Sequence, residues 1–447
     1  MSSDRPRLHY QRELEVRYQT DVLVVGGGPA GVAAALAAAR QGASVRLIEA
    51  HSCLGGMGTA GRVPAFMQFT DGVNFLADGI GRQILDALTA TGGAFPWKDS
   101  TGIQPEALKR VYDQLLMEAG VPFTFHTRLV DVIGDEGQVH QAICAGKSGL
   151  FAIRATVFVD CTGDGDVAAF AGAPYEKGDP DGVMQAGTLC SLWSGLDWET
   201  IDASRYWGGT GSDGIEQAIE DGVFTVEDRA LVGFWRVGAT LGGGNIGHTF
   251  DLDGTDEESL TRAYVQGRKS MPEYERFYKE YREGYDEIEL AATGSLMGVR
   301  ETRRIMGDYV LTLDDYLRRA VFDDEIGRHS YNIDLHASKP TKVAATAARK
   351  QWDTLRLKEG ESYGIPYRVL TPQGLANVLV AGRCVSTDRK VNGAIRVMPA
   401  CYITGQAAGV AAAIASQGEP DVHAIDVRKL QARLRALGAY LPNLDGN

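Results

Sequence analysis

The sequence predicts an α/β protein built on a largely parallel sheet, with a second, smaller α+β lobe. Three segments carry this prediction, at residues 21–56, 155–173 and 375–415, and each combines an apolar strand, a glycine-containing turn and a helix of small residues. Continuous apolar strands are typical of parallel sheets, whose strands are buried on both faces. With 447 residues the chain is too long for one compact core, so two or three lobes are expected.

The composition is that of a folded protein, and it excludes some classes of partner. Hydrophobic residues make up 44% of the chain and charged residues 23%, which is ordinary for a globular protein. The net charge of -13 argues against nucleic acid, because phosphate binding needs a basic face. The six cysteines lie far apart and form no CxxC pair, so we expect neither a metal site nor a redox dithiol.

The start of the chain shows no targeting or membrane signal. Residues 1–19 are polar and lack the apolar centre of a signal peptide. The apolar run after them is interrupted by three glycines and Pro29, so it does not predict a membrane span. A reduced, cytoplasmic location is therefore the simplest expectation.

The first segment is predicted to hold a dinucleotide. After the strand "DVLVV", Gly26, Gly28 and Gly31 form a G-x-G-x-x-G turn, and "VAAALAAARQ" continues as a helix that ends at Gly42. Gly26 allows the tight turn, Gly28 lets a pyrophosphate approach the backbone, and Gly31 lets the helix pack on the strand. The N–H groups that begin the helix favour phosphate.

The second strand of this segment, "ASVRLIEA", ends in a carboxylate. Glu49 lies 18 residues after Gly31, where an acidic group accepts hydrogen bonds from the ribose hydroxyls. A carboxylate at this place disfavours a 2′-phosphate, so NADP is not expected.

The rest of the sequence favours FAD over NAD. A second glycine-rich loop, "HSCLGGMGTAG", follows Glu49, and a long flavin cofactor needs backbone that passes this close. The segments at 155–173 and 375–415 supply two further strand–helix units, the last with a strand ending at Gly382 and a helix beginning near Pro399. The N-terminus of that last helix could face the flavin and stabilise charge on it. An NAD-dependent dehydrogenase without flavin remains the alternative.

The motifs resemble those of a known family. "VVGGGPAGVAAA", "CLGGMGTAG", "CTGDGDVAA", "VRETRRIMGDYVLT", "YNIDLH", "GIPYRVLTP" and "NVLVAGRCVS…GAIRVMPACYITGQAAGVAAA" are similar to the FAD-dependent oxidoreductases whose FAD domain is shared by fumarate-reductase-like and glutathione-reductase-like flavoproteins. The resemblance runs from about residue 21 to 415 and implies a Rossmann-type FAD-binding domain, but it does not imply a substrate. The residues expected to line the cofactor are Gly26, Gly28, Pro29, Ala30, Gly31, Glu49, Ala50, Gly55, Gly56, Met57, Thr59, Val130, Thr162, Gly163, Asp164, Gly382, Arg383, Met398 and Gln406.

Some features of related flavoproteins are missing from the sequence. Only the G-x-G-x-x-G turn at Gly26 stands in a complete strand–glycine–helix unit; no second such unit for NAD(P)H is expected, and residues 242–244, which follow no clear strand–helix frame, are expected to be a loop. "AGRC" stands where flavin hydroxylases carry a Gly-Asp pair, which argues against hydroxylation driven by NAD(P)H. We therefore expect electrons to come from an organic substrate or from a partner protein.

The middle of the chain is predicted to form the second lobe. An amphipathic helix at 105–120 is followed by a small antiparallel meander at 121–160. After Pro174 we expect a long strand at 183–193 and a charged amphipathic helix at 256–281. The expected division is an FAD-binding domain at 1–173, with 61–104 leaning into the cleft, a substrate or cap domain at 174–339, and the C-terminal part of the FAD domain at 340–447.

Two polar segments are candidates for chemistry. Asp334 and His336 in "YNIDLH" would lie on one face of an extended segment, and a His–carboxylate pair suits acid–base work near neutral pH. Arg300, Arg303 and Arg304 follow in "GVRETRR", where a strand would put Arg300 and Arg304 on one face, unless they only form ion pairs with Glu301 or another carboxylate.

Three single residues complete the candidates. Arg396 precedes the last helix and could bind an anionic substrate or the reduced flavin. His248 lies among glycines that would let a substrate come close, although a buried structural histidine is the alternative. Cys53 could in principle tether a flavin.

The expected function is that of an FAD-dependent oxidoreductase. It would transfer a hydride between bound flavin and a small organic substrate, from a C–H next to O or N or to an activated alkene. The alternatives are the flavin-free NAD enzyme and a non-catalytic flavin-binding subunit that passes electrons to a partner. Self-association is left open.

Overall fold

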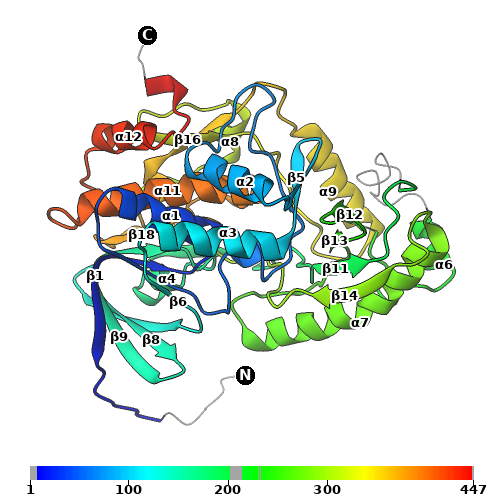
Figure 1. Ribbon diagram of the computed structural model, residues 1–447, viewed down its shortest axis with the longest axis horizontal. Coiled ribbons are helices and arrows are strands. Elements are labelled where there is room, and N and C mark those ends of the chain that lie inside the picture. The colour runs from blue at the N-terminus through cyan, green and yellow to red at the C-terminus, as the bar shows by residue number, and fades with distance from the viewer. Residues whose placement is uncertain (1–7, 202–213, 230, 232, 445–447) are drawn as a thin grey trace.

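The fold is described by a computed structural model that covers residues 8–201, 214–229, 231 and 233–444 (Figure 1). Its centre is a seven-stranded sheet in the order β6-β2-β1-β9-β8-β7, with β18 beside β9. The strands around β1 and β9 pair in parallel, whereas β7, β8 and β9 form an antiparallel meander, and both features confirm the predicted fold class. These strands are β1 (Val16–Val25), β2 (Val45–Ile48), β6 (Phe123–Thr124), β7 (Arg128–Asp135), β8 (Gln138–Gly146), β9 (Gly149–Asp160) and β18 (Val378–Val380).

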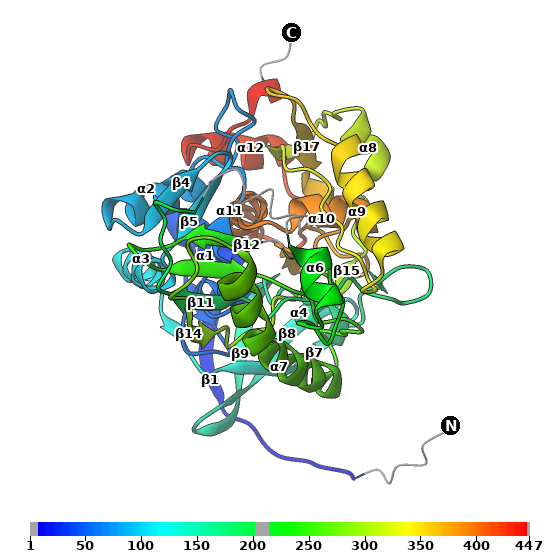
Figure 2. The same cartoon turned by 90° about the vertical axis from the view of Figure 1, so that its right-hand side faces the viewer.

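Two helices of small residues, α1 (Pro29–Arg40) and α11 (Met398–Ala415), pack against each other beside this sheet. A Cβ atom added at Gly405 or at Gly409 would lie 2.2 Å from a carbonyl oxygen of α1, so the two helices touch through their backbones. Within the described part of the chain, α11 is the one helix that is long and apolar enough to cross a membrane. All of it is buried, and it runs through the middle of the molecule as a core helix (Figure 2).

The glycine-rich loop after β2 contains the short helix η1 (Gly56–Gly58) and leads to a small antiparallel sheet in the order β3-β5-β4. The helix predicted at 105–120 is confirmed as α3. The indole N–H of Trp235, in the second lobe, donates to Ser100 Oγ at 3.2 Å, so this segment contacts that lobe. The elements here are β3 (Ala65–Phe66), α2 (Ile80–Ala90), β4 (Ala94–Trp97), β5 (Ser100–Ile103) and α3 (Pro105–Glu118).

A second hydrophobic core is formed by a four-stranded antiparallel sheet in the order β12-β13-β11-β14 and the long helix α7. Trp193, Phe277 and Ile288 are fully buried in it. The charged helix expected at 256–281 is confirmed as α7. The elements are β11 (Ser191–Ser194), α6 (Ile215–Glu220), β12 (Gly233–Arg236), β13 (Gly242–Asn245), α7 (Glu257–Tyr281) and β14 (Glu289–Thr293).

Two predictions in this lobe were wrong. Residues 242–244, expected as a loop, form most of strand β13, which pairs with β11 and β12. Neighbouring residues leave no room for side chains at these positions. A Cβ at Gly243 would lie 2.5 Å from Pro64 Cβ, and one at Gly242 2.7 Å from Leu196 Cδ2. Packing here overrides the low strand propensity of glycine. The long strand expected at 183–193 is reduced to β11, since the residues before it make only isolated bridges at Gly187 and Thr188.

The remaining chain returns from the second lobe to the first core. Buried residues such as Ile305, Leu311 and Ile326 pack there, although the expected cap domain extended to residue 339. We therefore propose that the second lobe spans about residues 184–302, within which 202–213 lie outside the described residues. The remaining elements are α4 (Asp166–Phe170), β10 (Tyr175–Lys177), β15 (Arg303–Ile305), α8 (Leu313–Leu317), β16 (Glu325–His329), α9 (Lys342–Thr354), β17 (Tyr363–Pro366), η2 (Tyr367–Val369), α10 (Arg389–Ile395), α12 (Val427–Ala436) and η3 (Pro442–Leu444).

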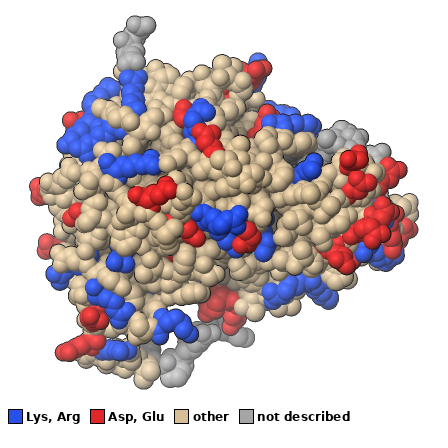
Figure 3. All heavy atoms as spheres, viewed as in Figure 1, with Lys and Arg blue, Asp and Glu red and all other residues tan. Residues whose placement is uncertain are grey.

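The charged side chains are unevenly spread over the surface. Figure 3 shows acidic side chains gathered at the end of the molecule that carries α6 and α7. Helix α6 contributes Glu216 and Glu220, and α7 contributes Glu273, Glu275 and Glu280. This end of the second lobe therefore carries a visible part of the acidic excess of the chain.

Candidate cofactor site and active site

The glycine turn between β1 and α1 leaves an open space in front of a helix. Gly26 has a φ of +98°, and a Cβ at Gly31 would lie 1.8 Å from the carbonyl oxygen of Gly26, so both positions require glycine for the turn itself. Gly28 differs, because a Cβ there would meet nothing within 4 Å. It is the N-cap of α1, and no side chain caps the helix. The N–H groups that begin α1 thus face an open cradle that suits a pyrophosphate.

Glu49 lies buried beside this cradle. Its Oε2 accepts from Gly27 N at 2.7 Å and its Oε1 accepts from His51 N at 2.8 Å. Each carboxylate oxygen can accept further hydrogen bonds, so both remain able to receive ribose hydroxyls. The second glycine loop packs directly on the first, since Gly55 N donates to Gly27 O at 2.8 Å and a Cβ at Gly56 would lie 3.2 Å from Gly28 Cα. These residues fit the adenosine half of a dinucleotide.

The predicted segments at 155–173 and 375–415 meet through one arginine. Arg383 donates to Gly163 O at 3.0 Å and to Asp164 Oδ1 at 2.7 Å, and it also reaches Val299 O at 2.8 Å. Thr162 is held in turn by Asp160 at the end of β9. The turn after β9 and the turn after β18 therefore form one continuous edge beside α11.

Four residues that were expected to line the cofactor contact other parts of the protein or are exposed. Gln406 joins α11 to the start of α2, because its Oε1 accepts from Ile80 N at 3.2 Å and its Nε2 donates to Asp78 O at 3.3 Å. These bonds give Gln406 a structural role, and its contact with the cofactor stays a prediction. Met398 packs its sulfur against Gly58, and Val130 is 40% exposed at a bulge in β7. Thr59 is bonded to Leu54 O within its own loop.

A row of four polar side chains lies where the two lobes meet. His336 Nε2 is 3.3 Å from Asp334 Oδ2, and its Nδ1 is 2.7 Å from His248 Nε2. His248 Nδ1 is in turn 2.9 Å from Asp228 Oδ2. The structure thus brings the predicted Asp334, His336 and His248 together. Sequence reasoning missed Asp228, which stands in no motif.

Arg396 organises this row from the side of α11. It is the C-cap of α10, directly before the N-cap Val397 of α11. Its Nη1 donates to Gln185 Oε1 at 3.0 Å and to Arg300 O at 3.2 Å, and its Nη2 donates to Asp334 O at 2.7 Å and to Asp334 Oδ2 at 3.4 Å. These four bonds use the terminal N–H groups of the guanidinium, so Arg396 positions the site rather than offering a free fork to a substrate.

Arg300 is a half-buried cation without a carboxylate within ion-pair distance among the described residues. It donates to Ala186 O at 2.7 Å and to Thr188 Oγ1 at 3.0 Å, and more loosely to Asn245 Oδ1 at 3.5 Å. Burial and the neighbouring Arg396 lower the pKa of Arg300 to about 10. An anionic group bound beside Arg300 would relieve this unfavourable burial.

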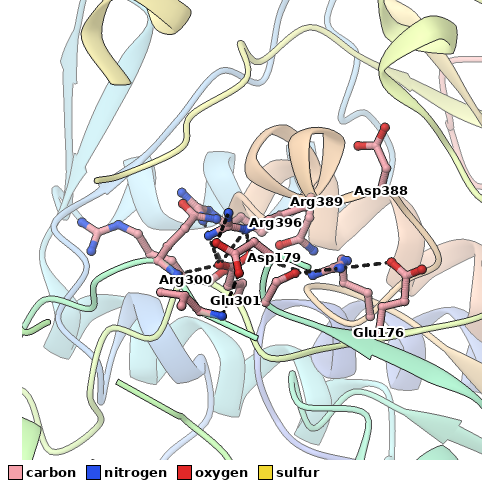
Figure 4. A network of polar contacts seen from close by, with 12 residues as sticks. Glu176, Asp179, Arg300, Glu301, Asp388, Arg389 and Arg396 are labelled. Carbon is pink, nitrogen blue, oxygen red and sulfur yellow. Dashed lines mark hydrogen bonds and ion pairs between the residues drawn. The ribbon is translucent and has the colours of Figure 1, made fainter. Parts of the chain in front are cut away.

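The expectation that one strand carries Arg300 and Arg304 on a shared face was wrong. Only Arg303–Ile305 is a strand, and Arg304 turns away to Glu176 Oε2 at 3.2 Å. Glu301 pairs with Arg389 at 2.8 Å instead of Arg300. Figure 4 shows the resulting network, which extends from Glu176 past Glu301 to Arg300 and Arg396. The side chains of Arg300 and Arg304 diverge because the strand begins only at Arg303, which the sequence does not show.

The ionisation of the central pair follows from its surroundings. Burial and the nearby Arg300 lower the pKa of His336 to about 3, so its ring is neutral at pH 7. Burial opposes ionisation of Asp334, but His336, Arg396 and Arg300 outweigh it and hold the pKa of that carboxyl well below its usual range. A neutral imidazole beside a fixed carboxylate can accept a proton and be stabilised as it does so. Burial raises the pKa of the Cys53 thiol, which makes it a poor nucleophile for tethering a flavin.

Several solved structures are similar to this chain over most of its length. A p-nitrophenol 4-monooxygenase from Pseudomonas putida is 11% identical, with 93% of this chain and 84% of that chain covered at a TM-score of 0.47. A geranylgeranyl bacteriochlorophyll reductase-like protein from Thermoplasma acidophilum is 12% identical, with 94% and 82% covered at a TM-score of 0.44. A myxobacterial chondrochloren halogenase is 13% identical, with 94% and 79% covered at a TM-score of 0.41. None of these likenesses assigns a substrate.

The family is shown by the sequence itself. No curated protein sequence matched the chain. A family model described as "FAD dependent oxidoreductase" matches residues 21–434, which is most of the chain and includes the cradle, Glu49 and the row of four side chains. This match excludes the alternative of an NAD-dependent dehydrogenase without flavin. The chain belongs to the FAD dependent oxidoreductase family, and its cofactor is FAD.

Proposed function

We propose that this protein transfers a hydride between its bound FAD and a small organic substrate, and that His336 takes the proton released when the substrate is oxidised. The observation that carries the proposal is the neutral, half-buried His336 beside the ionised Asp334. Both lie next to Arg396 at the start of α11, the helix expected to face the flavin.

The chemistry divides between the cofactor and the chain. Bound FAD supplies an acceptor for the hydride. Oxidation of a C–H next to O–H or N–H also releases a proton, and an imidazole within reach can take it. Arg300 lies close enough to the pair to affect its charge, and it would hold the oxygen or a carboxylate of the substrate.

Asp334 gives the proton a stable place. When His336 is protonated, its 3.3 Å hydrogen bond to Asp334 Oδ2 becomes charge-assisted. Asp334 is itself held by Arg396, so the carboxylate cannot turn away. Reduction of an activated alkene would use the same proton in the opposite direction.

The test is a single-turnover measurement on His336→Gln. An anaerobic screen of alcohols, amines, sugars and organic acids first identifies a compound that bleaches the flavin. We expect His336→Gln to keep its FAD and to lose about 10²–10⁴-fold in the rate of flavin reduction. The matched control is His140→Gln, which removes an exposed histidine that also pairs with an aspartate, Asp135, at 3.0 Å. A normal rate in His336→Gln would remove this residue from the reaction.

The same screen tests the alternative of a non-catalytic flavin-binding subunit. Bleaching by any small compound at a saturable rate would count against that alternative. Complete failure of the screen, with reduction only by a partner protein, would favour it over the proposal.

A further inference from the structure

The side chain of Arg300 is half-buried and is held by neutral partners within the described part of the chain. Its Nη1 donates to Ala186 O at 2.7 Å and to Thr188 Oγ1 at 3.0 Å, which uses both N–H bonds of that nitrogen. Its Nη2 makes one contact, with Asn245 Oδ1 at 3.5 Å, which is long for a hydrogen bond. Nη2 therefore keeps an N–H for a further acceptor.

The surroundings of Arg300 leave its positive charge poorly compensated. Burial and the neighbouring Arg396 lower the pKa of the guanidinium to about 10, and the acidic groups nearby, of which Asp334 has the largest effect, do not outweigh them. Glu301, the next residue in the chain, pairs with Arg389 at 2.8 Å instead (Figure 4). An anion bound to Arg300 would compensate its charge.

Two side-chain amides beside Arg300 have N–H groups that lack an acceptor among the described residues. Gln185 Oε1 accepts from His336 N and from Arg396 Nη1, both at 3.0 Å, so the orientation of this amide is fixed and its buried Nε2 is left without a partner. Asn245 is half-buried, its Oδ1 accepts from Arg300, and its Nδ2 makes no hydrogen bond there. This corner of the site thus has spare donors and lacks an acceptor.

We propose that Arg300 and Asn245 bind a carboxylate of the substrate, so that the protein acts on a small carboxylate anion. A carboxylate only accepts hydrogen bonds, and its two oxygens match the planar guanidinium. That the bound anion is the substrate rests on the proposed function of His336. The two places are close, because Gln185 bonds to the backbone of His336 and Arg300 lowers the pKa of its ring.

The first test is equilibrium binding to the FAD-loaded protein, which needs no turnover. The probes are acetate, lactate, succinate and phenylacetate, each compared with its uncharged primary amide by anaerobic titration calorimetry. We expect at least one of these carboxylates to bind about 10- to 150-fold more tightly than its amide, as for one charge-assisted hydrogen bond. Equal or weaker binding of every carboxylate would overturn the proposal.

The second test places the binding at Arg300. Arg300→Gln removes the cation, and Asn245→Asp puts a carboxylate within reach of Arg300 Nη2, where it competes with the probe. We expect both variants to retain FAD and to lose the preference for a carboxylate over its amide. The control Arg236→Gln should keep the preference, because it removes an exposed arginine of the same lobe that donates to Gly238 O at 3.3 Å.

Asn245→Asp also covers the case in which Arg300→Gln does not fold, because it leaves Arg300 and its bonds to the backbone in place. An unchanged preference for the carboxylate in folded, FAD-loaded Asn245→Asp, or in folded Arg300→Gln, would contradict the inference.

The rate of flavin reduction separates this inference from the proposed function. A carboxylate that binds through Arg300 but reduces the flavin equally fast in the wild type and in His336→Gln would defeat the proposed function and leave the binding site for the carboxylate in place. An uncharged compound that reduces the flavin at a rate lost in His336→Gln but unchanged in Arg300→Gln would support the proposed function and overturn this inference.

Discussion

The substitution Gly28→Ala separates cofactor binding from folding more cleanly than any other change in the glycine turn. Gly28 has φ −67° and ψ −176°, which any residue adopts, and an added Cβ would meet no atom within 4 Å. The methyl group should therefore not strain the protein without cofactor, and it should stabilise it by about 0.4–1 kcal/mol by restricting the unfolded chain. The same methyl group would occupy the space in which we place the pyrophosphate.

The expected loss of affinity follows from the hydrogen bonds at the start of α1. Displacing the phosphate from one backbone N–H costs about 1.5–3 kcal/mol for a charged partner, which raises the dissociation constant of FAD about 10- to 150-fold. Titration of the apoprotein with FAD, followed by flavin fluorescence, measures this constant, and thermal unfolding of the apoprotein measures stability.

The matched control is Gly418→Ala, because Gly418 also has open space around it and no left-handed φ, but lies in the turn after α11. We expect Gly418→Ala to bind FAD as the wild type does. Equal affinity in Gly28→Ala and Gly418→Ala would refute the placement of the pyrophosphate. A lower melting temperature of the Gly28→Ala apoprotein would show that the space has a structural use.

Three further predictions concern the ribose, the reductant and pH. Glu49→Ala should weaken FAD binding by at least the roughly 10- to 150-fold expected for one charge-assisted bond. The control Asp315→Asn alters a buried carboxylate in the capping box of α8 and should lower stability only. Equal FAD content of the Glu49→Ala protein and the wild type after dialysis would refute the ribose contact. NADH and NADPH should reduce the flavin slowly, since we expect only one dinucleotide-binding unit in the chain, and rapid saturable bleaching at micromolar concentrations in an anaerobic stopped-flow experiment would show otherwise. Burial lowers the pKa of His329 to about 3. Between pH 6.5 and 3 the unfolded chain therefore binds a proton that the folded chain does not, and the free energy of unfolding falls by about 1.4 kcal/mol for each unit by which the pH is lowered. His329→Asn should make the decline in thermal stability between pH 6.5 and 5 shallower, and an unchanged slope would exclude His329 as a cause.

The parts of the fold that the sequence predicts are those fixed by local patterns. The strand, turn and helix around Gly26 and Gly31 depend on residues close in sequence, because each glycine is required by a neighbouring backbone atom. Helix α11 is signalled in the same way by a long run of small residues. The meander and α7 follow from their periods of two and 3.6 residues.

Strand β13 was not predictable because its formation depends on distant residues. Its glycines carry no strand signal. The strand forms by pairing with β11 and β12, and Pro64 and Leu196 fill the space beside it. The same limit applies to Arg396, whose position beside the site was expected but whose bonds to Gln185 and Asp334 were not. A residue's neighbours in sequence show where it lies along the chain, whereas its role depends on partners from other segments.

The row of polar side chains illustrates the limit most clearly. Asp334 and His336 are two residues apart and were expected to interact, whereas His248 and Asp228 reach His336 from the second lobe. The glycines around His248 were the one sequence signal for this part of the row. Asp228 gave none, because a single aspartate outside a motif is indistinguishable from a surface carboxylate.

A crystal structure of the FAD-loaded protein is the most direct test of the central claim, that the cofactor held by Gly28 and Glu49 reaches the site of His336. We expect the pyrophosphate on the N–H groups at the start of α1 and the ribose hydroxyls on Glu49. We also expect the flavin ring at the start of α11, with room for one small molecule between the ring and His336. A flavin ring bound away from Asp334 and His336, with protein between them, would contradict the proposed function.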